Sequence, residues 1–507
     1  MIVRRLREYI QRISLVASLF GIHLLEDPND LFLKISQKLR ALGIPIRTIR
    51  LPTPSQLGEQ LYDQGQLSLS AAEFEKKGIR GKLRARKIWR QISELNMPIL
   101  DSVPLVRDGH PHNILFYLTN SKPFTQSGYT ERSHFILKAL QNHGMKVQAV
   151  TRLGYPFVIG DFPRRKNLIL DGIGYRQLRP ALFPRNKVQQ VELAVQMLVD
   201  EAKTFNADIL HTTTDYKNAI IVSRAAQVLG IPWIYETRGE LQKTWLSKKS
   251  SDIYEIASES EYYLAAESKE LEAMESAAAL VMLSEVSKRN AVEQGVAEDK
   301  IQVIPNAVSS SEIGRDFSKE HLRDELGLRS RNVLIGAITS IVGYEGLDDL
   351  IRAIQVLPEV DCIIVGEGES KLKLEELVAK LGLGKQIQFM GKQSANSIWK
   401  WYAALDIFVI PRKNQEVCRT VTPIKTLMAQ ANGVPVVASD LPALREVTGN
   451  CAVYFQSEDP QNLAHAIRDV ISDKSGVANR QSERGKKWVS SRTWDSNAEK
   501  LIHMYEA

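Results

Sequence analysis

Cysteine is scarce in this sequence, and several familiar motifs are missing. The cysteines Cys362, Cys418 and Cys451 lie far apart and form no CxxC pair, so no disulfide framework or zinc site is indicated and a reducing compartment is favoured. No GxGxxG motif occurs, so the sequence gives little indication of a dinucleotide-binding site. Basic residues are not interleaved with aromatic ones, so we expect no nucleic-acid partner.

A long hydrophobic run is also absent. The apolar stretch over residues 13–25 follows Arg4, Arg5, Arg7 and Arg12 but is too short to span a bilayer comfortably. No small-x-small cleavage site follows, which argues against a signal peptide. We expect an amphipathic helix that either packs on the body of the protein or lies on an anionic membrane face. The basic stretch over residues 76–90 has the same character.

The length and the charge distribution indicate several domains. A chain of 507 residues is too long for one hydrophobic core. The first 100 residues hold 17 Lys and Arg against 9 Asp and Glu, whereas the remainder is close to neutral. We therefore expect residues 1–110 to form a basic, mostly helical N-terminal extension.

An α/β pattern begins at His112. We predict a buried strand, a loop, a helix and a second strand over residues 113–118, 121–128, 130–143 and 146–151. Gly128 in the loop would let backbone amides approach an anion closely. A later strand over residues 232–235 ends at Glu236 and Arg238, at the end of a strand where α/β proteins carry functional side chains. The alternative is a surface loop of mixed charge.

Strict alternation of strands and helices resumes near Asn332. It predicts a second parallel, doubly wound sheet with right-handed crossovers. The fold class we expect is α/β, with two Rossmann-like domains facing a cleft that takes the substrate. The expected boundaries are 111–310 for the first domain, 311–478 for the second, and 479–507 for a final helix that crosses back to the first.

The segment from Leu405 to Asp440 carries the strongest indication of a ligand site. Two apolar strands, 406–411 and 434–439, enclose a helix expected from about residue 422 to 431. Cations precede or begin that helix: Arg412, Lys413, Arg419 and Lys425. Cations beside a helix amino end form a site for a phosphorylated anion. The alternative is a solvated loop whose charges only keep it in water.

These segments resemble the GT-B fold, retaining glycosyltransferases of the GT4, or group 1, family. The resemblance covers residues 112–507 and is carried by the order of its motifs: SGYTERSHFILKALQNHGMKV, IPWIYETRGE, IQVIPNAV, YEGLDDLIRAI, IIVGEGES, IQFMGKQS and VIPRKNQEVCRTVTPIK. Residues 1–110 match no family that we recognise.

The resemblance implies transfer of a sugar, with retention and without an obligatory metal, from a nucleotide sugar to a saccharide or lipid-linked acceptor. Arg412, Lys413 and Lys425 would hold the diphosphate together with the amides around Gly128. Arg238 would face donor and acceptor. The remaining candidates implied by the resemblance are Glu236 in the catalytic set and Asn306, Gly391 and Lys392 in the donor site.

Two departures from the family leave alternatives open. At the positions of the two usual donor-site glutamates the chain has Arg419 and Met428, and Glu416 is the nearby carboxylate that could replace the first.

An active transferase for surface polysaccharide or glycolipid synthesis would be cytoplasmic, with peripheral contact to the inner face of the plasma membrane through residues 1–100. The other hypothesis is a GT-B protein that binds without turnover and serves as the scaffold of an active transferase. An epimerase would need clustered acid–base residues, for which we find no convincing set.

Overall fold

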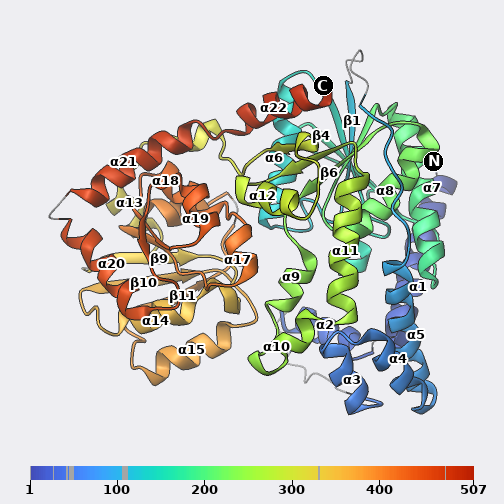
Figure 1. Cartoon of the computed structure of the whole chain (residues 1–507), viewed down its shortest axis with the longest axis horizontal. Helices are drawn as coiled ribbons and strands as arrows, with labels where there is room; N and C mark the ends of the chain where they lie inside the picture. Colours follow the sequence, from blue (N-terminus) through green and yellow to red (C-terminus); the bar gives the residue numbers. More distant parts are fainter. Residues whose placement is uncertain are drawn as a thin grey trace. The chain divides into compact units, whose positions relative to one another are not determined.

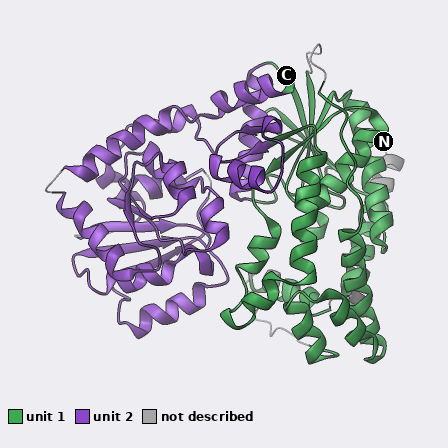
Figure 2. Cartoon of the chain, in the orientation of Figure 1, with its two compact units in different colours: residues 1–125, 144–280, 505–507 green, residues 126–143, 281–504 purple. Residues whose placement is uncertain are grey.

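The chain forms two compact units. The structure is a computed structural model that describes residues 2–26, 28–41, 44, 51–105, 112–328, 332–394, 396–473 and 476–506. Unit 1 consists of Met1–Thr125, Gly144–Leu280 and Tyr505–Ala507, and unit 2 of Gln126–His143 and Val281–Met504 (Figure 2). The two predicted sheets are confirmed (Figure 1). The domain boundaries expected from the sequence stay predictions.

The basic N-terminal region is helical, as expected. Its helices are α1 (Ile2–Glu26), α2 (Pro28–Ala41), α3 (Gln56–Asp63), α4 (Leu67–Glu75) and α5 (Gly78–Leu95). Phe74 of α4 and Ile88 of α5 are fully buried. The two helices approach so closely that a Cβ on Gly81 would lie 2.2 Å from the carbonyl oxygen of Phe74. In the described ranges, no helix combines the length and the apolar character needed to cross a membrane.

The first sheet has the strand order β3-β4-β2-β1-β5-β6-β7-β8. Its strands are β1 (Asn113–Leu118), β2 (Lys146–Thr151), β3 (Asn167–Leu170), β4 (Ile173–Gln177), β5 (Ile209–Thr213), β6 (Trp233–Thr237), β7 (Ala279–Met282) and β8 (Ile301–Val303). The edge hairpin β3–β4 is antiparallel and was not expected. Its turn is Asp171-Gly172 with both residues at positive φ, the sequence signal of a tight hairpin.

Helices connect the strands of this first half. They are α6 (Gly128–Asn142), α7 (Lys187–Phe205), α8 (Tyr216–Leu229), α9 (Leu241–Leu246), α10 (Ser251–Ser258), α11 (Glu261–Ser276) and α12 (Glu285–Glu293). The composition of residues 243–279, rich in Glu, Ala and Lys, predicts one long helix, and this prediction is wrong because three helices, α9, α10 and α11, occupy the segment. Ser260 accepts a hydrogen bond from the amide of Tyr263 and caps α11, which starts a new helix where periodicity alone predicts continuation.

The second sheet lies in unit 2 and is entirely parallel, with the order β11-β10-β9-β12-β13-β14. Its strands are β9 (Val333–Ile338), β10 (Val360–Val365), β11 (Ile387–Gly391), β12 (Ile407–Ile410), β13 (Val436–Ser439) and β14 (Val453–Phe455). One core packs around Ile335, Leu350 and Ile364, and the other around Phe408 and Leu427. Buried apolar clusters of this kind explain why the strands lack polar alternation.

The helices of unit 2 alternate with these strands. They are α13 (Lys319–Glu325), α14 (Leu347–Ile354), α15 (Lys371–Lys380), α16 (Ile398–Ala403), α17 (Glu416–Thr420), α18 (Lys425–Ala431), α19 (Pro442–Thr448), α20 (Pro460–Ser472), α21 (Val477–Ser490) and α22 (Trp494–Glu506). The single final helix expected from residue 479 is wrong. The amide of Val308 bonds the carbonyl of Arg492 at 3.0 Å, and this bridge ends α21 before α22 begins.

Candidate functional site

A pocket of about 500 Å³ lies in unit 2 at the edge where the strands of its sheet end. This volume is in the range of sites for small molecules and cofactors. Residues that follow β9, β10 and β11 line it, together with the first turns of α6 and α18: Gly128, Glu131, Thr339, Ser340, Gly366, Glu367, Lys392, Gln393, Lys425 and Met428. Phe135 of α6 and Trp494 of α22 also contribute, and their rings stack with centroids 5.8 Å apart.

The sheet order explains why the pocket forms there. The chain builds β9, β10 and β11 toward one edge and then places β12 on the other side of β9. Ligands of open α/β sheets bind at such a reversal of strand order. Thr339 directly follows β9, and Arg412 comes two residues after β12. Side chains distant in sequence therefore meet at the reversal.

A buried carboxylate organises the cations at this reversal. Glu345, in the turn η4 (Gly343–Glu345), is 3% exposed. It accepts hydrogen bonds from Nη2 of Arg412 at 3.0 Å and from Nζ of Lys425 at 2.9 Å. Lys425 also donates to Oγ1 of Thr339. The following Gly346 has φ +70° and allows close approach, since a Cβ there would lie 1.8 Å from the carbonyl oxygen of Pro411.

The electrostatics of this cluster favour an added anion. Burial raises the pKa of Glu345, but the attraction of Arg412 and Lys425 outweighs it and lowers that pKa to about 2. The pKa of Lys425 is lowered, because burial and the charge of Arg412 outweigh the attraction of Glu345. The pKa of Arg412 is raised: burial lowers it, and Glu345 more than compensates. One carboxylate thus serves two cations, which leaves a net positive charge beside the pocket.

The cations expected at the anion site do not all lie there. Lys425 and Lys392 line the pocket, whereas Arg412 is buried beside it and donates to the carbonyl of Val421 at 2.9 Å. The expectation that Lys413 holds the diphosphate is wrong. Its Nζ bonds Asp348 and Asp349 of α14 at 2.8 and 3.1 Å, so its charge is already compensated. The loop carries Lys413 to α14 because its amide bonds the carbonyl of Tyr344.

Residues after Lys413 form a short helix instead of the expected loop. Glu416 begins α17 and is exposed, and it does not line the pocket. Arg419 is exposed too, and its Nη1 bonds Oδ1 of Asn414 at 3.0 Å. Helix α18 begins at Lys425 and not near 422. The carbonyls of Val421 and Thr422 accept bonds from Arg412 and Asn306.

The other expected donor-site residues lie at or near the pocket. Gly128 lines it and is the first residue of α6, whose cap Ser127 accepts a bond from the amide of Thr130. Gly391 ends β11 at φ +66°, directly before Lys392. Asn306 is buried and donates to the carbonyl of Thr422 at 2.9 Å. Asn306 therefore connects its own loop to the segment before α18, next to Ala307, which lines the pocket.

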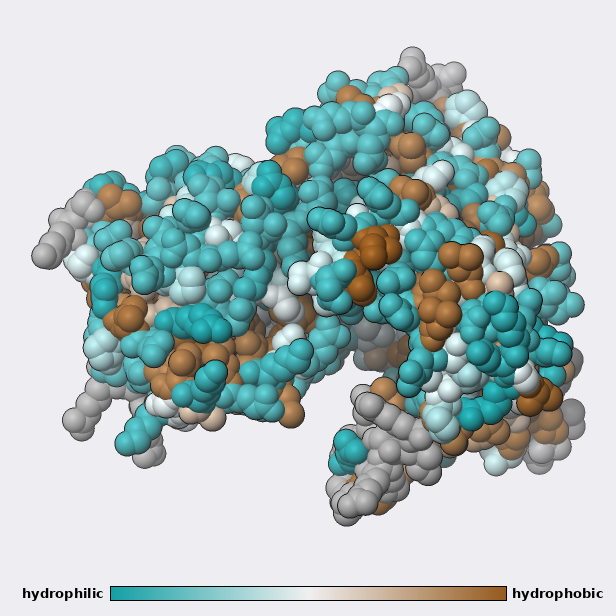
Figure 3. Space-filling view, turned by 60° about the horizontal axis from the view of Figure 1, so that its bottom comes forward, coloured by the Kyte–Doolittle hydropathy of each residue, from teal (hydrophilic) through white to brown (hydrophobic). Residues whose placement is uncertain are grey.

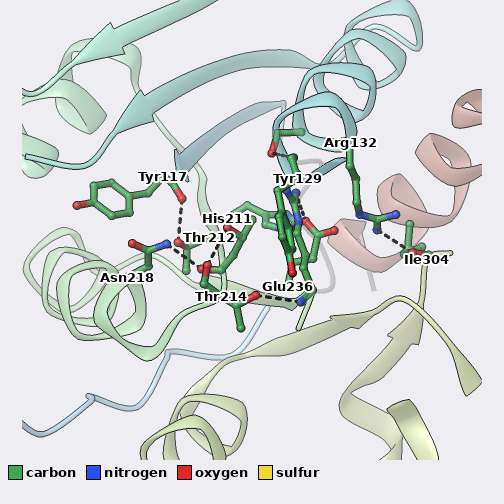
Figure 4. Close-up of polar contacts among 12 residues, drawn as sticks. Tyr117, Tyr129, Arg132, His211, Thr212, Thr214, Asn218, Glu236 and Ile304 are labelled. Atoms are coloured by element: carbon green, nitrogen blue, oxygen red, sulfur yellow. Dashed lines mark hydrogen bonds and ion pairs between the residues drawn. The ribbon is translucent and has the colours of Figure 1, made fainter. Parts of the chain in front are cut away.

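Arg132 is a buried residue of this region that the sequence argument missed. It is 1% exposed, and it projects from α6 toward the loop after β8 (Figure 4). Its guanidinium donates to the carbonyls of Ile304 and Pro305 at 2.7 and 2.9 Å and to Oδ1 of Asn306 at 3.3 Å. Arg132 therefore fixes the amino end of α6 beside the pocket. In the sequence it looks like an ordinary helix cation, since its partners are about 170 residues away.

Glu236 and Arg238, the expected catalytic residues, belong to a buried network in unit 1. Glu236 is fully buried, and its Oε2 lies 2.6 Å from Nη2 of Arg238 and 3.6 Å from Nε2 of His211 (Figure 4). His211 Nδ1 lies 2.7 Å from the hydroxyl of Tyr505 near the chain end. Since Glu236 has no exposed surface, its carboxylate holds Arg238 in place. Both side chains are buried, and the catalytic role expected of Glu236 and Arg238 stays a prediction.

Comparison with known families agrees with this architecture. A family model described as glycosyl transferases group 1 matches residues 318–488, and one described as glycosyl transferase 4-like domain matches residues 127–307. The chain belongs to the group 1 glycosyltransferases. Both matches begin after residue 126, so the N-terminal helices lie outside them.

Relatives of this glycosyltransferase are distant. A lipopolysaccharide core biosynthesis mannosyltransferase of Rhizobium meliloti is 29% identical over 191 residues, which are 35% of this chain and 52% of the relative. The match thus spans about half of that relative's length.

Solved structures share its fold. Sucrose-phosphate synthase of Thermosynechococcus elongatus has a TM-score of 0.64 at 16% identity, covering 78% of this chain and 98% of that one. The Anabaena protein HepE in complex with UDP-glucose has a TM-score of 0.58 at 18% identity, covering 77% of this chain and 98% of that one.

Proposed function

We propose that this glycosyltransferase moves a sugar from a nucleotide-sugar donor to a saccharide or lipid-linked acceptor, with retention at the anomeric carbon, in the synthesis of a surface polysaccharide or another glycoconjugate. The observation that carries this proposal is the net positive cluster of Arg412, Glu345 and Lys425 at the strand-order reversal beside a pocket of about 500 Å³. A structural neighbour bound to UDP-glucose and a mannosyltransferase relative support the same chemistry.

The pocket provides the electrostatics that the leaving group requires. A nucleoside diphosphate gains negative charge as its bond to the sugar breaks, and preorganised cations stabilise that charge. In our proposal Lys425 and Lys392 meet the phosphates, and the amino end of the fifteen-residue helix α6 at Gly128 supplies further positive potential. In our proposal these positive groups stabilise the diphosphate without a metal ion.

The experiment compares two lysines of similar chemistry and different position. Lys425→Ala should weaken the binding of the preferred UDP-, GDP- or ADP-sugar by more than tenfold, about 1.4 kcal/mol, in calorimetry. Lys413→Ala is the control and should change the affinity less than threefold, because Lys413 is paired with Asp348 and Asp349. Failure of all three nucleotide sugars to bind, or equal effects of both substitutions, would reject the proposed donor site.

A scaffold that binds without turnover is the second candidate. It is favoured by Met428, which lines the pocket where relatives carry a carboxylate, and by Arg419, which bonds Asn414 outside the pocket lining. Transfer and hydrolysis assays on the purified chain separate the two functions. Sugar release from a nucleotide sugar that binds supports the transferase. Tight binding without release of sugar in the presence of the acceptor panel supports the scaffold.

We also propose peripheral contact with an anionic membrane through helix α1. Tyr9, Ile10 and Ile13 are each more than half exposed, and Phe20 is nearly half exposed. Hydrophobic groups lie scattered among hydrophilic ones on the face seen in Figure 3. A groove of about 460 Å³ runs between α1 and the turn η1 (Phe157–Ile159).

Cations border this groove. Arg12 bonds the carbonyl of Phe162 at 3.0 Å, and Arg179 lies over the ring of Phe157. The exposed sequence 164–166 adds three more positive charges. Apolar side chains beside cations are typical of surfaces that bind anionic lipids.

Liposome sedimentation tests the membrane contact. The double substitution Ile13→Glu and Phe20→Glu should release the protein from phosphatidylglycerol vesicles. Leu69→Glu, at an equally exposed apolar position on α4, should leave binding unchanged. Binding that persists in the double variant would refute this contact.

A further inference from the structure

A second cavity, of about 290 Å³, lies in unit 1 at the carboxyl ends of β1, β2 and β5. It is lined by Tyr117 and Thr119 at the end of β1, by Arg152 after β2, and by Asp215, Lys217 and Asn218 after β5. The N-terminal helices complete it with His23 of α1 and Glu94 of α5. These two residues lie outside the residues that the two family models match.

Nε of Arg152 is buried in this cavity without a hydrogen-bond partner among the described residues. The hydroxyl of Tyr117 is buried in the same cavity and interacts with the backbone of Leu153. Tyr117 is fully buried, and its ring points away from His211 and Thr212 (Figure 4). Arg152 is otherwise held by Oδ1 of Asn120, at 3.2 Å from Nη2. A buried polar group without a partner is costly, and a bound ligand is one way to satisfy it.

The charges of the cavity favour an anion. Glu94 is compensated by Lys187 at 2.8 Å and by Lys217 at 3.9 Å. Asp215 is occupied as the cap of α8, where it accepts a bond from the amide of Lys217. No carboxylate lies within ion-pair distance of the guanidinium of Arg152 among the described residues, and the more distant Asp215 attracts it only through space. The guanidinium is therefore the cation that an anionic ligand would meet.

The remaining lining suits a hydroxylated ring. Asn218 donates to Oγ1 of Thr119 at 2.8 Å, which orients both side chains at the cavity wall. With Nδ1 of His23 donating to the carbonyl of Leu19 at 2.9 Å, Nε2 is the ring nitrogen available to accept a bond from a hydroxyl. Val158, Phe183 and other apolar residues form the opposite wall. The volume, near the lower limit for ligand sites, fits one small ring.

We infer that this cavity binds a small anionic polyol, such as a monosaccharide or cyclitol with one phosphate group, with the anionic group on Arg152 and the hydroxyls on Tyr117, Asn218 and His23. Two sources share this chemistry: the acceptor of the transfer reaction, or an effector that is not consumed. Binding itself does not depend on the proposed transferase activity, so it is testable without a nucleotide sugar.

Calorimetry on the full-length chain provides the test, with glucose 6-phosphate and myo-inositol 1-phosphate as probes. Each should bind at least tenfold more tightly than glucose, inositol or inorganic phosphate alone. Arg152→Gln should weaken binding at least tenfold, and Tyr117→Phe, which retains the ring, at least threefold. Arg176→Gln on β4 is the matched control, because Arg176 pairs with Gln148 away from the cavity lining.

A second measurement separates the two sources. After incubation with the nucleotide sugar that binds the chain, a glycosylated probe identifies the acceptor, and an unchanged probe that still binds identifies the effector. Both results support the cavity. Two results would overturn the inferred binding site. One is that neither probe gives a heat of binding at 10 mM. The other is that Arg152→Gln and Tyr117→Phe fold normally and bind the probes as tightly as the natural chain.

Discussion

Replacing Glu345 by Gln is the sharpest test of how the cation cluster is held. The substitution keeps the size of the side chain but leaves Arg412 and Lys425 without their shared carboxylate. The pKa of Glu345 falls from 4.5 to about 2 on folding. Each pK unit corresponds to about 1.4 kcal/mol, so the interaction contributes about 3 kcal/mol to the stability of the fold. Breaking a buried ion pair by removing one partner has a cost of similar size, about 3–5 kcal/mol.

The pH dependence follows from the sign of this shift. A carboxylate whose pKa is lowered on folding contributes its full stabilisation above its unfolded pKa, and that contribution is lost as the pH falls toward the folded pKa. Urea unfolding of unit 2, followed by tryptophan fluorescence, should therefore show Glu345→Gln about 3 kcal/mol less stable at pH 7, with the difference narrowing between pH 5 and pH 3.

Glu367→Gln provides the control. Glu367 follows the neighbouring strand β10, but its side chain is 49% exposed, so its replacement should change the stability by less than about 0.5 kcal/mol. A free energy of unfolding of Glu345→Gln within about 0.5 kcal/mol of that of the natural chain at pH 7, or a difference that does not depend on pH, would contradict the stabilising role of Glu345.

Two further predictions concern the same chain. The pKa of Lys425 is lowered, and only its protonated amine attracts a diphosphate. The affinity for a nucleoside diphosphate should therefore fall as the pH rises through that pKa, while Lys425→Arg should keep its affinity to higher pH. Calorimetry between pH 7.5 and 10 tests this, and a parallel loss of affinity in the natural chain and the variant would contradict it. Gly81→Ala should destabilise the N-terminal helices by about 2 kcal/mol in thermal unfolding, since the new Cβ would lie 2.2 Å from the carbonyl oxygen of Phe74. Gly21→Ala inside α1, with no atom within 4 Å, should instead stabilise the protein by up to about 1 kcal/mol, because alanine favours a helix over glycine. Equal effects of the two substitutions would disprove the close packing of α4 and α5.

Local patterns predicted most of the strands. The strands predicted over residues 113–118 and 146–151 agree with the structure at both ends, because an apolar run depends on only a few neighbouring residues. The helices expected over 243–279 and from 479 onward failed at Ser260 and near Arg492. A capping side chain interrupts the first, and the second ends at a bridge to Val308, which is more than 180 residues away in the sequence.

The candidate site was predictable only in part. Lys392, Lys425 and Gly128 were found from their motifs, and they line the pocket. Glu345 and Arg132 were not recognised as structural centres. Their partners lie 67 and more than 170 residues away, so no local pattern marks them.

By itself, the sequence determined the alternation of strands and helices, and with it two mainly parallel sheets whose strand ends gather loops at one edge. Only the tertiary structure decided which cations have charge left for a ligand. Lys413 and Lys425 look alike in the sequence, yet the first is compensated by Asp348 and Asp349 while the second shares Glu345 with Arg412. Charge compensation depends on distances between segments that only the folded sheet brings together.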